Sequence, residues 1–252
     1  MTRGVALVTG GAKRIGRAIV ESLADAGYAV AIHFHHSGDE AHHLANSLCE
    51  AGVKALALGA NLADPAATKS LISRATAALG PVTLLVNSAS IFEPDDIVHL
   101  DVELWDETFA VNLRAPMLLA RDLAHYLPEG ASGAIVNVID QRVLRLNPQF
   151  FSYTLTKSAL AVATRTMAQA LAPHIRVNGV APGPTCAGHR QTAQDFARQS
   201  AATLLGQGPT PAQIAEAVLF LAQATSVTGQ VLAVDGGQHL LWRTADVDGI
   251  PE

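Results

Sequence analysis

The sequence has little cysteine, few aromatic residues and no long apolar run, and each shortage excludes a class of protein. Its two cysteines, Cys49 and Cys186, cannot form a disulfide framework. We expect both to be small buried apolar residues, with more interest in Cys186 because it lies in a candidate substrate loop. The apolar segments are too short for a transmembrane helix, so no membrane partner is expected.

The charge balance adds further exclusions. The 17 basic and 22 acidic residues give a net charge of −5, which does not favour binding to nucleic acid or to an anionic membrane. The first residues, Met1 to Arg3, run directly into an apolar strand and leave no room for a signal peptide. We therefore expect a soluble, cytoplasmic protein.

Short apolar runs alternate with amphipathic helical stretches along the chain. Most runs are continuously apolar, which is typical of strands covered on both faces. Repeated strand–helix–strand units imply right-handed crossovers, so the sequence predicts an α/β fold: a doubly wound parallel sheet with helices on both faces. The predicted strands are Val5–Val8, Ala29–Phe34, Ala55–Leu58, Leu84–Asn87, Ala134–Val138, Arg176–Val180 and Val231–Val234, and examples of the helices are Arg14–Ala26, Ala41–Ala51 and Pro65–Leu79.

Several local signals mark the ends of helices. Gly27, Gly52 and Gly80 each follow a helical stretch, at the position that favours a left-handed residue. Thr210–Gln213 (TPAQ) has the pattern of a capping box with proline at the first helical position, and predicts a late helix to about Gln223.

No repeat or low-complexity linker divides the chain, so residues 1–252 are predicted to form one domain. Residues 184–208 have no strand pattern and several small residues, and we predict that they form a mobile lid over the substrate. Residues 244–252 are predicted to be a short C-terminal tail.

A glycine-rich turn, TGGAKRIG at residues 9–16, lies between the first strand and the first helix. Glycines such as Gly10 and Gly16 allow backbone N–H groups to approach a pyrophosphate at a helix N-terminus. The strand before the turn and the helix after it favour a dinucleotide site. A plain strand-to-helix turn is the alternative.

The second strand ends in HFHHS, and no acidic residue follows until Asp39. A non-phosphorylated ribose normally requires a carboxylate at this place. Because Arg14, His35, His36 and Ser37 can instead surround a 2′-phosphate, the sequence favours NADPH. A solvated polar loop is the alternative. A metal site is not expected, because no cysteine or carboxylate ligands accompany the histidines.

Tyr153 and Lys157 are four residues apart and so lie on one face of a helix. A nearby ammonium group favours the phenolate and is expected to lower the pKa of the tyrosine, which suits proton donation. Asp140 follows an apolar strand, thirteen residues before Tyr153. A carboxylate there is costly unless it is paired, exposed or used.

These motifs together resemble the short-chain dehydrogenase/reductase family, over roughly Gly4 to Leu241. The resemblance rests on the glycine turn and on Asn87-Ser88-Ala89-Ser90, Asn112, Tyr153-x-x-x-Lys157, Pro182-Gly183 and Asp235-Gly236-Gly237. It implies a Rossmann-type fold, a nicotinamide cofactor and a homotetramer.

The same resemblance implies roles for individual residues. Tyr153 would be the acid, Lys157 its electrostatic partner and a ligand of the cofactor ribose, and Asn112 part of a proton relay. The cofactor-binding residues would be Gly10, Arg14, Ile15, Gly16, His35, His36, Ser37, Asn61, Leu62, Asn87, Ala89, Tyr153, Lys157, Pro182 and Gly183.

Asp140 stands where ordinary members of the family have serine. This aspartate, together with AKRIG at residues 12–16, HFHHS at residues 33–37 and NSASIF at residues 87–92, resembles the pteridine reductase branch, which includes dihydromonapterin reductases. In that branch Phe92 would stack on a pterin ring, Ser90 would bond its polar edge, and Asp140 would deliver a proton with Tyr153. His36, where arginine is usual, departs from the branch. So does Asn61, where aspartate is usual, and Ser88 in the NSAS motif.

Other interpretations stay open. Asp140 can be a structural acid that pairs with Arg142 or Arg145, and Phe92 can be an ordinary packing residue. The leading hypothesis is an NADPH-dependent reductase of a C=N bond in dihydromonapterin, dihydrobiopterin or dihydrofolate. The alternatives are a carbonyl or ketoacyl reductase of the same family and a non-catalytic nucleotide-sensing protein.

Overall fold

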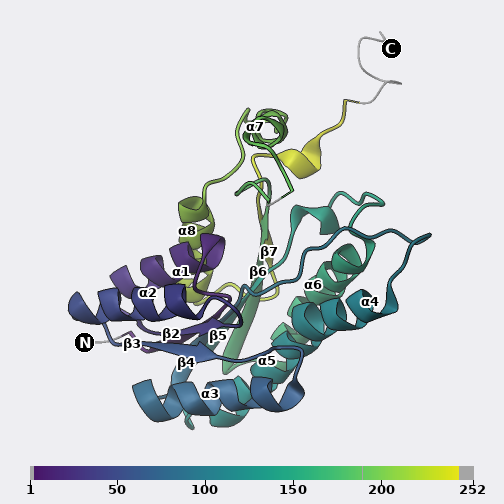
Figure 1. Cartoon of the computed structure of the whole chain (residues 1–252). Coiled ribbons are helices and arrows are strands. Elements are labelled where there is room, and N and C mark those ends of the chain that lie inside the picture. The colour runs from purple at the N-terminus through teal and green to yellow at the C-terminus, as the bar shows by residue number, and fades with distance from the viewer. Residues whose placement is uncertain (1–2, 189, 244–252) are drawn as a thin grey trace.

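The computed structural model describes residues 3–188 and 190–243. Apolar strands form a seven-stranded parallel sheet in the order β3-β2-β1-β4-β5-β6-β7 (Figure 1). The order reverses between β1 and β4, as in a doubly wound fold, so the predicted α/β architecture is confirmed. The strands are β1 (Val5–Thr9), β2 (Ala29–Phe34), β3 (Ala55–Gly59), β4 (Val82–Asn87), β5 (Gly133–Val138), β6 (Ile175–Pro182) and β7 (Val231–Val234).

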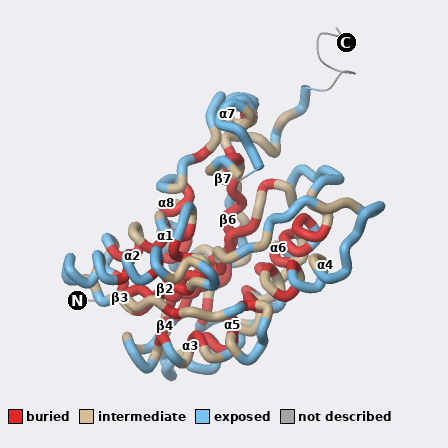
Figure 2. Tube along the Cα trace, viewed as in Figure 1, coloured by how far each residue is buried: buried red, intermediate tan, exposed pale blue. Residues whose placement is uncertain are grey.

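Helices cover both faces of the sheet, and buried residues concentrate along the central strands (Figure 2). One core joins the sheet to α1, α2 and α8, and the other joins it to α3, α5 and α6. The α-helices are α1 (Arg14–Asp25), α2 (Gly38–Glu50), α3 (Pro65–Leu79), α4 (Val102–Phe109), α5 (Ala115–Tyr126), α6 (Phe151–Leu171), α7 (Ala193–Ala201) and α8 (Pro211–Gln223). A π-helical turn η1 (Ala110–Arg114) and the 3₁₀ turns η2 (Gln141–Val143) and η3 (Gln238–Leu240) complete the elements.

The helix-end signals are confirmed. Gly27, Gly52 and Gly80 have positive φ angles of 91°, 84° and 102°. Thr210 caps α8 through its side chain, and the Gln213 side chain bonds back to Thr210, which completes the capping box.

Several of the predicted site residues lie at the carboxyl ends of the strands. Asn87 ends β4, Asp140 follows β5 and Pro182 ends β6. Because ligands of open parallel sheets bind at this edge, next to the reversal of strand order, this is where a site is expected. The predicted lid contains α7, which lies beyond the same edge (Figure 1). Its mobility stays a prediction.

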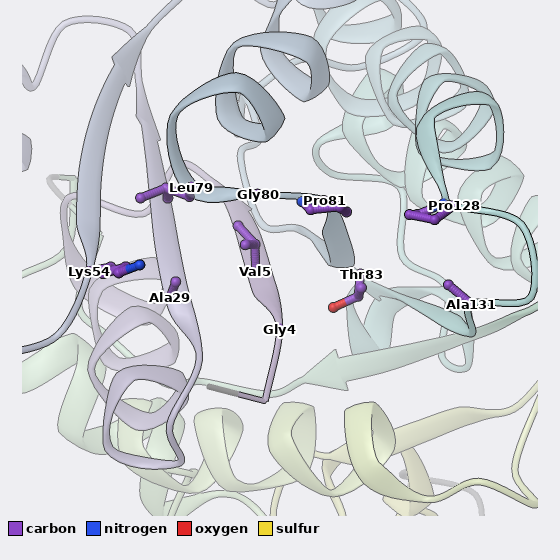
Figure 3. Close-up of a pocket in the computed structure, with 10 residues that line it drawn as sticks. All are labelled: Gly4, Val5, Ala29, Lys54, Leu79, Gly80, Pro81, Thr83, Pro128 and Ala131. Carbon is purple, nitrogen blue, oxygen red and sulfur yellow. The ribbon is translucent and has the colours of Figure 1, made fainter. Parts of the chain in front are cut away.

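A pocket of about 320 Å³ lies at the opposite edge of the sheet (Figure 3). It is lined by the first residues of strands, such as Val5 of β1 and Ala29 of β2, and by the turn at Gly80. None of the candidate site residues lines it, so this pocket does not carry the predicted chemistry.

The remaining predictions concern the cysteines, the membrane and the tail. Cys186 is half-buried, but Cys49 is exposed on α2, so the expectation that both are buried is wrong. Within the described ranges, no helix has the length and apolarity to cross a bilayer. The predicted tail, residues 244–252, lies outside the described residues.

Candidate active site

The glycine turn packs closely between β1 and α1. Gly10 has a φ of +64°, and a Cβ on Gly16 would lie 2.1 Å from the carbonyl oxygen of Gly10. Glycine is therefore required at both positions. The Thr9 hydroxyl accepts hydrogen bonds from the backbone N–H groups of Ser88 and Ala89, at 3.0 and 3.1 Å. These bonds join the turn to the loop after β4.

His33 holds this turn from the neighbouring strand. The Gly10 N–H donates to Nδ1 of His33 at 3.1 Å, and the Gly11 N–H donates to the His33 carbonyl at 3.0 Å. Since Nδ1 accepts, Nε2 carries the proton and donates to the Ala60 carbonyl at 3.1 Å. Burial lowers the pKa of His33 to about 4, so the ring is neutral at pH 7.

The sequence did not predict this role of His33, which is the first histidine of the HFHHS segment. Among residues 3–188 and 190–243, no three histidine, cysteine or acidic side chains converge on a common point.

The loop after β2 presents the residues predicted to meet a 2′-phosphate. His35 and His36 are exposed, with ring centroids 3.6 Å apart. Ser37 is the N-cap of α2, but its hydroxyl makes no capping bond. The cation found here is Lys13, which forms an ion pair with Glu40 at 2.5 Å. Sequence reasoning missed Lys13.

Arg14 lies elsewhere in the site. Its backbone is left-handed, with a φ of 54°, and its guanidinium donates to the Cys186 carbonyl at 3.2 Å. In this structure Arg14 therefore joins the glycine turn to the predicted lid. Its role toward a phosphate stays a prediction.

Asn87, at the end of β4, belongs to a buried polar chain. Its amide donates to Asn137 at 2.8 Å, and Asn137 in turn donates to Thr164 at 2.9 Å. The Asn87 Oδ1 atom is buried and has no hydrogen-bond partner among the described residues. Such an acceptor requires a donor from a bound group or a water molecule.

Asn112 lies on the π-helical turn η1, a feature that is frequent at functional sites. Its Oδ1 accepts from the Ile91 N–H at 2.8 Å, and its Nδ2 donates to the Ile91 carbonyl at 2.9 Å and to Thr156 at 3.2 Å. Asn112 thus fixes the loop after β4 against α6. The relay role implied by the family stays a prediction.

Tyr153 and Asp140 meet directly. The Tyr153 hydroxyl donates to Asp140 Oδ2 at 2.8 Å. The other oxygen, Oδ1, accepts from the Arg142 backbone N–H at 2.7 Å and lies 3.9 Å from the Arg142 guanidinium. Asp140 therefore caps the 3₁₀ turn η2 and binds the tyrosine at the same time, so both interpretations of this residue have a structural basis.

The charges around Tyr153 differ from the sequence expectation. Burial, followed by the charge and hydrogen bond of Asp140, raises the pKa of Tyr153 well above its usual value. The expectation that Lys157 lowers the pKa of Tyr153 is therefore wrong. Burial also lowers the pKa of Lys157 to about 8, and its Nζ donates to the Val138 carbonyl at 2.7 Å.

Phe92 contacts Tyr153 and a second phenylalanine. Its ring stacks on Phe150, with centroids 4.1 Å apart and planes within 8°, and meets Tyr153 edge-on at 4.6 Å. Phe150 has a left-handed backbone, with a φ of 56°, which is rare for a bulky residue. Nothing in the local sequence marked Phe150 as part of the site.

The loop between β4 and α4 is tied to the site at further points. Glu93 forms an ion pair with Arg190 of the predicted lid at 2.6 Å, and Arg190 also donates to the Phe92 carbonyl at 2.7 Å. Asp95 accepts from the Ser152 backbone N–H at 3.0 Å and from its hydroxyl, at the start of α6. Sequence reasoning missed these contacts.

The other predicted residues line the same edge without forming a common cluster. Ser90 is exposed, and its hydroxyl bonds only weakly to the Ile91 carbonyl at 3.4 Å. Asn61 is exposed, and its side chain accepts from the Ala63 N–H. The remaining ones are buried or half-buried: Ile15, Leu62, Ala89, Pro182 and Gly183.

Known proteins resemble this chain over nearly its whole length. Residues 10–239 match the family described as Enoyl-(Acyl carrier protein) reductase. A short-chain type dehydrogenase/reductase of Picea abies is 32% identical, over 93% of this chain and 92% of that protein.

The chain belongs to the short-chain dehydrogenase/reductase family. It is thus an oxidoreductase of the Rossmann type, as the motifs predicted. A 3-oxoacyl-(acyl-carrier-protein) reductase of Staphylococcus epidermidis is also similar, with 31% identity over 93% of this chain and 98% of that protein.

One solved structure is more similar to this chain than the two relatives above. The FolM alternative dihydrofolate reductase 1 of Brucella canis, complexed with NADP, is 49% identical over 98% of both chains, with a TM-score of 0.95. This similarity confirms the predicted resemblance to the pteridine reductase branch of the family.

The neutral His33 predicts a pH dependence of stability. The unfolded imidazole takes up a proton below pH 6.5, whereas folded His33 resists protonation until about pH 4. The unfolded state then binds more protons, so this residue reduces the free energy of unfolding by roughly 2–3 kcal/mol as pH falls through this window.

Denaturant unfolding at several pH values between 7 and 4 would measure how the free energy of unfolding changes with pH. His33→Asn should flatten this dependence, while His43→Asn, at an exposed position on α2, should leave it unchanged. Equal slopes in wild type and His33→Asn would contradict the assignment.

Asp140 also predicts a titration that needs no substrate. Asp140→Asn removes the negative charge beside Tyr153, so the tyrosine should ionise at lower pH than in the wild type. The ultraviolet absorbance of tyrosinate measures this change. The double variant Asp140→Asn, Tyr153→Phe lacks this hydroxyl and so identifies the absorbance change that belongs to Tyr153. An unchanged titration in Asp140→Asn would refute the effect of the Asp140 charge on the pKa of Tyr153.

Proposed function

We propose that this protein is an NADPH-dependent reductase that transfers hydride to a C=N bond of a reduced pterin, with Tyr153 and Asp140 supplying the proton. The hydrogen bond between Tyr153 and Asp140 carries the proposal. Reduction of a C=N bond requires a proton at nitrogen, and this pair lies at the edge of the sheet where the fold binds ligands.

The residues present fit a nicotinamide dinucleotide phosphate. The glycine turn is built for close backbone approach, and the buried Asn87 Oδ1 lacks a donor. Lys13, with the free N-cap hydroxyl of Ser37, offers a cation and donors for a 2′-phosphate at the N-terminus of α2. NADP in the similar Brucella canis structure supports the same choice. When bound, NADPH supplies the hydride.

Side chains of this protein donate the proton and replace it. Tyr153 donates it to the substrate nitrogen and recovers one through Asp140, whose carboxylate reaches it at 2.8 Å. Lys157 holds the helix against β5 through the Val138 carbonyl and offers a cation below the tyrosine. Asn112 bonds to both Ile91 and Thr156 and so holds them in place. The proposal includes a proton relay that runs through Asn112 and water.

The substrate would stack on Phe92, with Ser90 at its polar edge. Phe92 is 37% exposed and meets Tyr153 edge-on, so a flat ring placed against it comes next to the proton donor. Phe150 covers one face of the Phe92 ring. The name of the similar Brucella canis enzyme, a dihydrofolate reductase, supports a reduced pterin as the ring.

A carbonyl or ketoacyl reductase is the second candidate. It is favoured by the similarity to the 3-oxoacyl-(acyl-carrier-protein) reductase, whose substrates are ketones by its name. Asp140 favours the nitrogen ring instead, because a carboxylate can accept hydrogen bonds from ring N–H groups and stabilise a protonated C=N bond, whereas a ketone oxygen carries no proton to donate. A non-catalytic nucleotide sensor has less support, because such a protein needs neither Tyr153 nor Lys157.

Three further features are proposed. The family resemblance supports a homotetramer, and the sequence itself supports a cytoplasmic location and one catalytic domain over residues 1–252. Light scattering of the purified protein tests the tetramer.

The direct test follows NADPH oxidation with dihydrobiopterin, dihydromonapterin and dihydrofolate, beside a panel of ketones. Turnover of pterins alone supports the proposal. Turnover of ketones alone would overturn it and favour the second candidate. Tyr153→Phe should abolish turnover by either route, and a wild type without any turnover would favour the sensor.

Phe92→Ala is expected to raise KM for the pterin by about five- to 150-fold, because a stacking contact with an aromatic ligand contributes roughly 1–3 kcal/mol. The Kd for NADPH, measured by titration calorimetry, should stay within about twofold. Ile97→Ala, an exposed apolar residue of the same loop, is the matched control. An unchanged KM in Phe92→Ala would remove the support for a stacked substrate.

A further inference from the structure

Arg142 is a cation at the edge of the catalytic pair that the family motifs did not single out. Its side chain is only 14% exposed, although it belongs to the short turn η2 after β5. The guanidinium carbon lies 5.4 Å from the centroid of the Phe92 ring and 5.1 Å from that of Phe150. A charged group so far removed from water is costly unless other charges or ligands compensate it.

The contacts of Arg142 point to Asp140. Its backbone N–H binds Oδ1 of Asp140 at 2.7 Å, and its Nη1 atom lies 3.9 Å from the same oxygen. The Nε atom is buried and finds no partner among the described residues. The guanidinium is therefore held by aromatic rings and one carboxylate, and no conventional hydrogen-bonded ion pair neutralises it.

Proton delivery by Tyr153 places two negative charges next to each other. When Tyr153 gives up its proton, a phenolate stands 2.8 Å from the Asp140 carboxylate. Like charges at this distance repel strongly in a buried site. Burial and Asp140 already raise the pKa of Tyr153, whereas Arg142 is the nearby charge that lowers it.

The other charged groups around the pair have partners of their own. Lys157 donates to the Val138 carbonyl, and its charge also interacts with Asp140 and lies 5.6 Å from the centroid of the Tyr153 ring. Arg190 of the predicted lid pairs with Glu93 and lies over the same two phenylalanine rings as Arg142. Asp95 binds the start of α6. His239, on the turn η3 that packs against η2, bonds Asp235 at 2.7 Å.

We propose that Arg142 is a positioning residue for proton delivery. Its backbone N–H fixes the Asp140 carboxylate so that Oδ2 faces Tyr153, and its guanidinium offsets the negative charge that the pair carries after the proton leaves. The substrate C=N bond receives a hydride from the cofactor at carbon and the Tyr153 proton at nitrogen, and the tyrosine is reprotonated through Asp140 from water. This role rests on the proposed use of Tyr153 and Asp140 as the proton source.

Arg142→Met tests the charge while it keeps an unbranched side chain beside the stacked rings of Phe92 and Phe150. We expect kcat to fall by about tenfold or more, with KM for NADPH within about twofold of wild type. The alkaline limb of kcat against pH should move upward by about one pH unit, because the pair holds its proton more tightly without the cation. Arg142→Lys should restore most of kcat and return the limb toward its wild-type position.

The matched control is Arg145→Met. Arg145 lies three residues further along the same segment, is exposed, and loses the same charge. It should leave kcat and the pH profile unchanged. If circular dichroism shows that Arg142→Met is unfolded, Arg142→Gln replaces it. Glutamine is uncharged but can donate a hydrogen bond, and this variant should show the same shift of the alkaline limb of kcat against pH.

Two outcomes would overturn the proposal. One is a fall in kcat with an unmoved alkaline limb in every folded uncharged variant, which would mean that Arg142 only packs the aromatic pair. The other is an equal effect of Arg142→Met and Arg145→Met. If the wild type reduces ketones and not pterins, the substrate proposal fails, but the same pH comparison with a ketone still decides the role of Arg142.

Discussion

The hydrogen bond between Tyr153 and Asp140 is the contact on which the arrangement of the site depends. It joins the end of β5 to the first turn of α6, and it places a hydroxyl and a carboxylate 2.8 Å apart where water has little access. Lys157, Arg142 and the capped turn η2 are all arranged around it. Without the acid at this strand end, the site would be an ordinary tyrosine–lysine pair of the family.

The loop between β4 and α4 connects this pair to the rest of the site. Asn112 holds it at Ile91, and Phe92 covers the aromatic side of Tyr153. Further along, Asp95 binds the N-terminus of α6, and Glu93 binds Arg190 of the predicted lid. One short segment therefore contacts Tyr153, the start of α6 and the predicted lid.

Much of the fold followed from local patterns. Continuous apolar runs predicted the parallel strands, and the capping box of α8 could be located from four consecutive residues. The candidate site was harder, because its contacts join distant parts of the chain. The bond from Gly10 to His33 and the pairing of Glu93 with Arg190 have no local signature, and burial, which governs the pKa of Tyr153, is not visible in residue spacing. The resemblance to a family supplied the tyrosine and the aspartate, but not Phe150 or Arg142.

The two engaged oxygens of Asp140 also bear on how such a site changes over evolutionary time. One oxygen caps η2 and the other binds Tyr153, whereas a serine at this position has a single hydroxyl. Aspartate and serine codons differ at more than one nucleotide, so a stepwise exchange passes through asparagine, glycine, alanine or tyrosine. None of these intermediates carries a carboxylate. No single-nucleotide step can therefore exchange this aspartate for serine without first losing the carboxylate that binds both η2 and Tyr153.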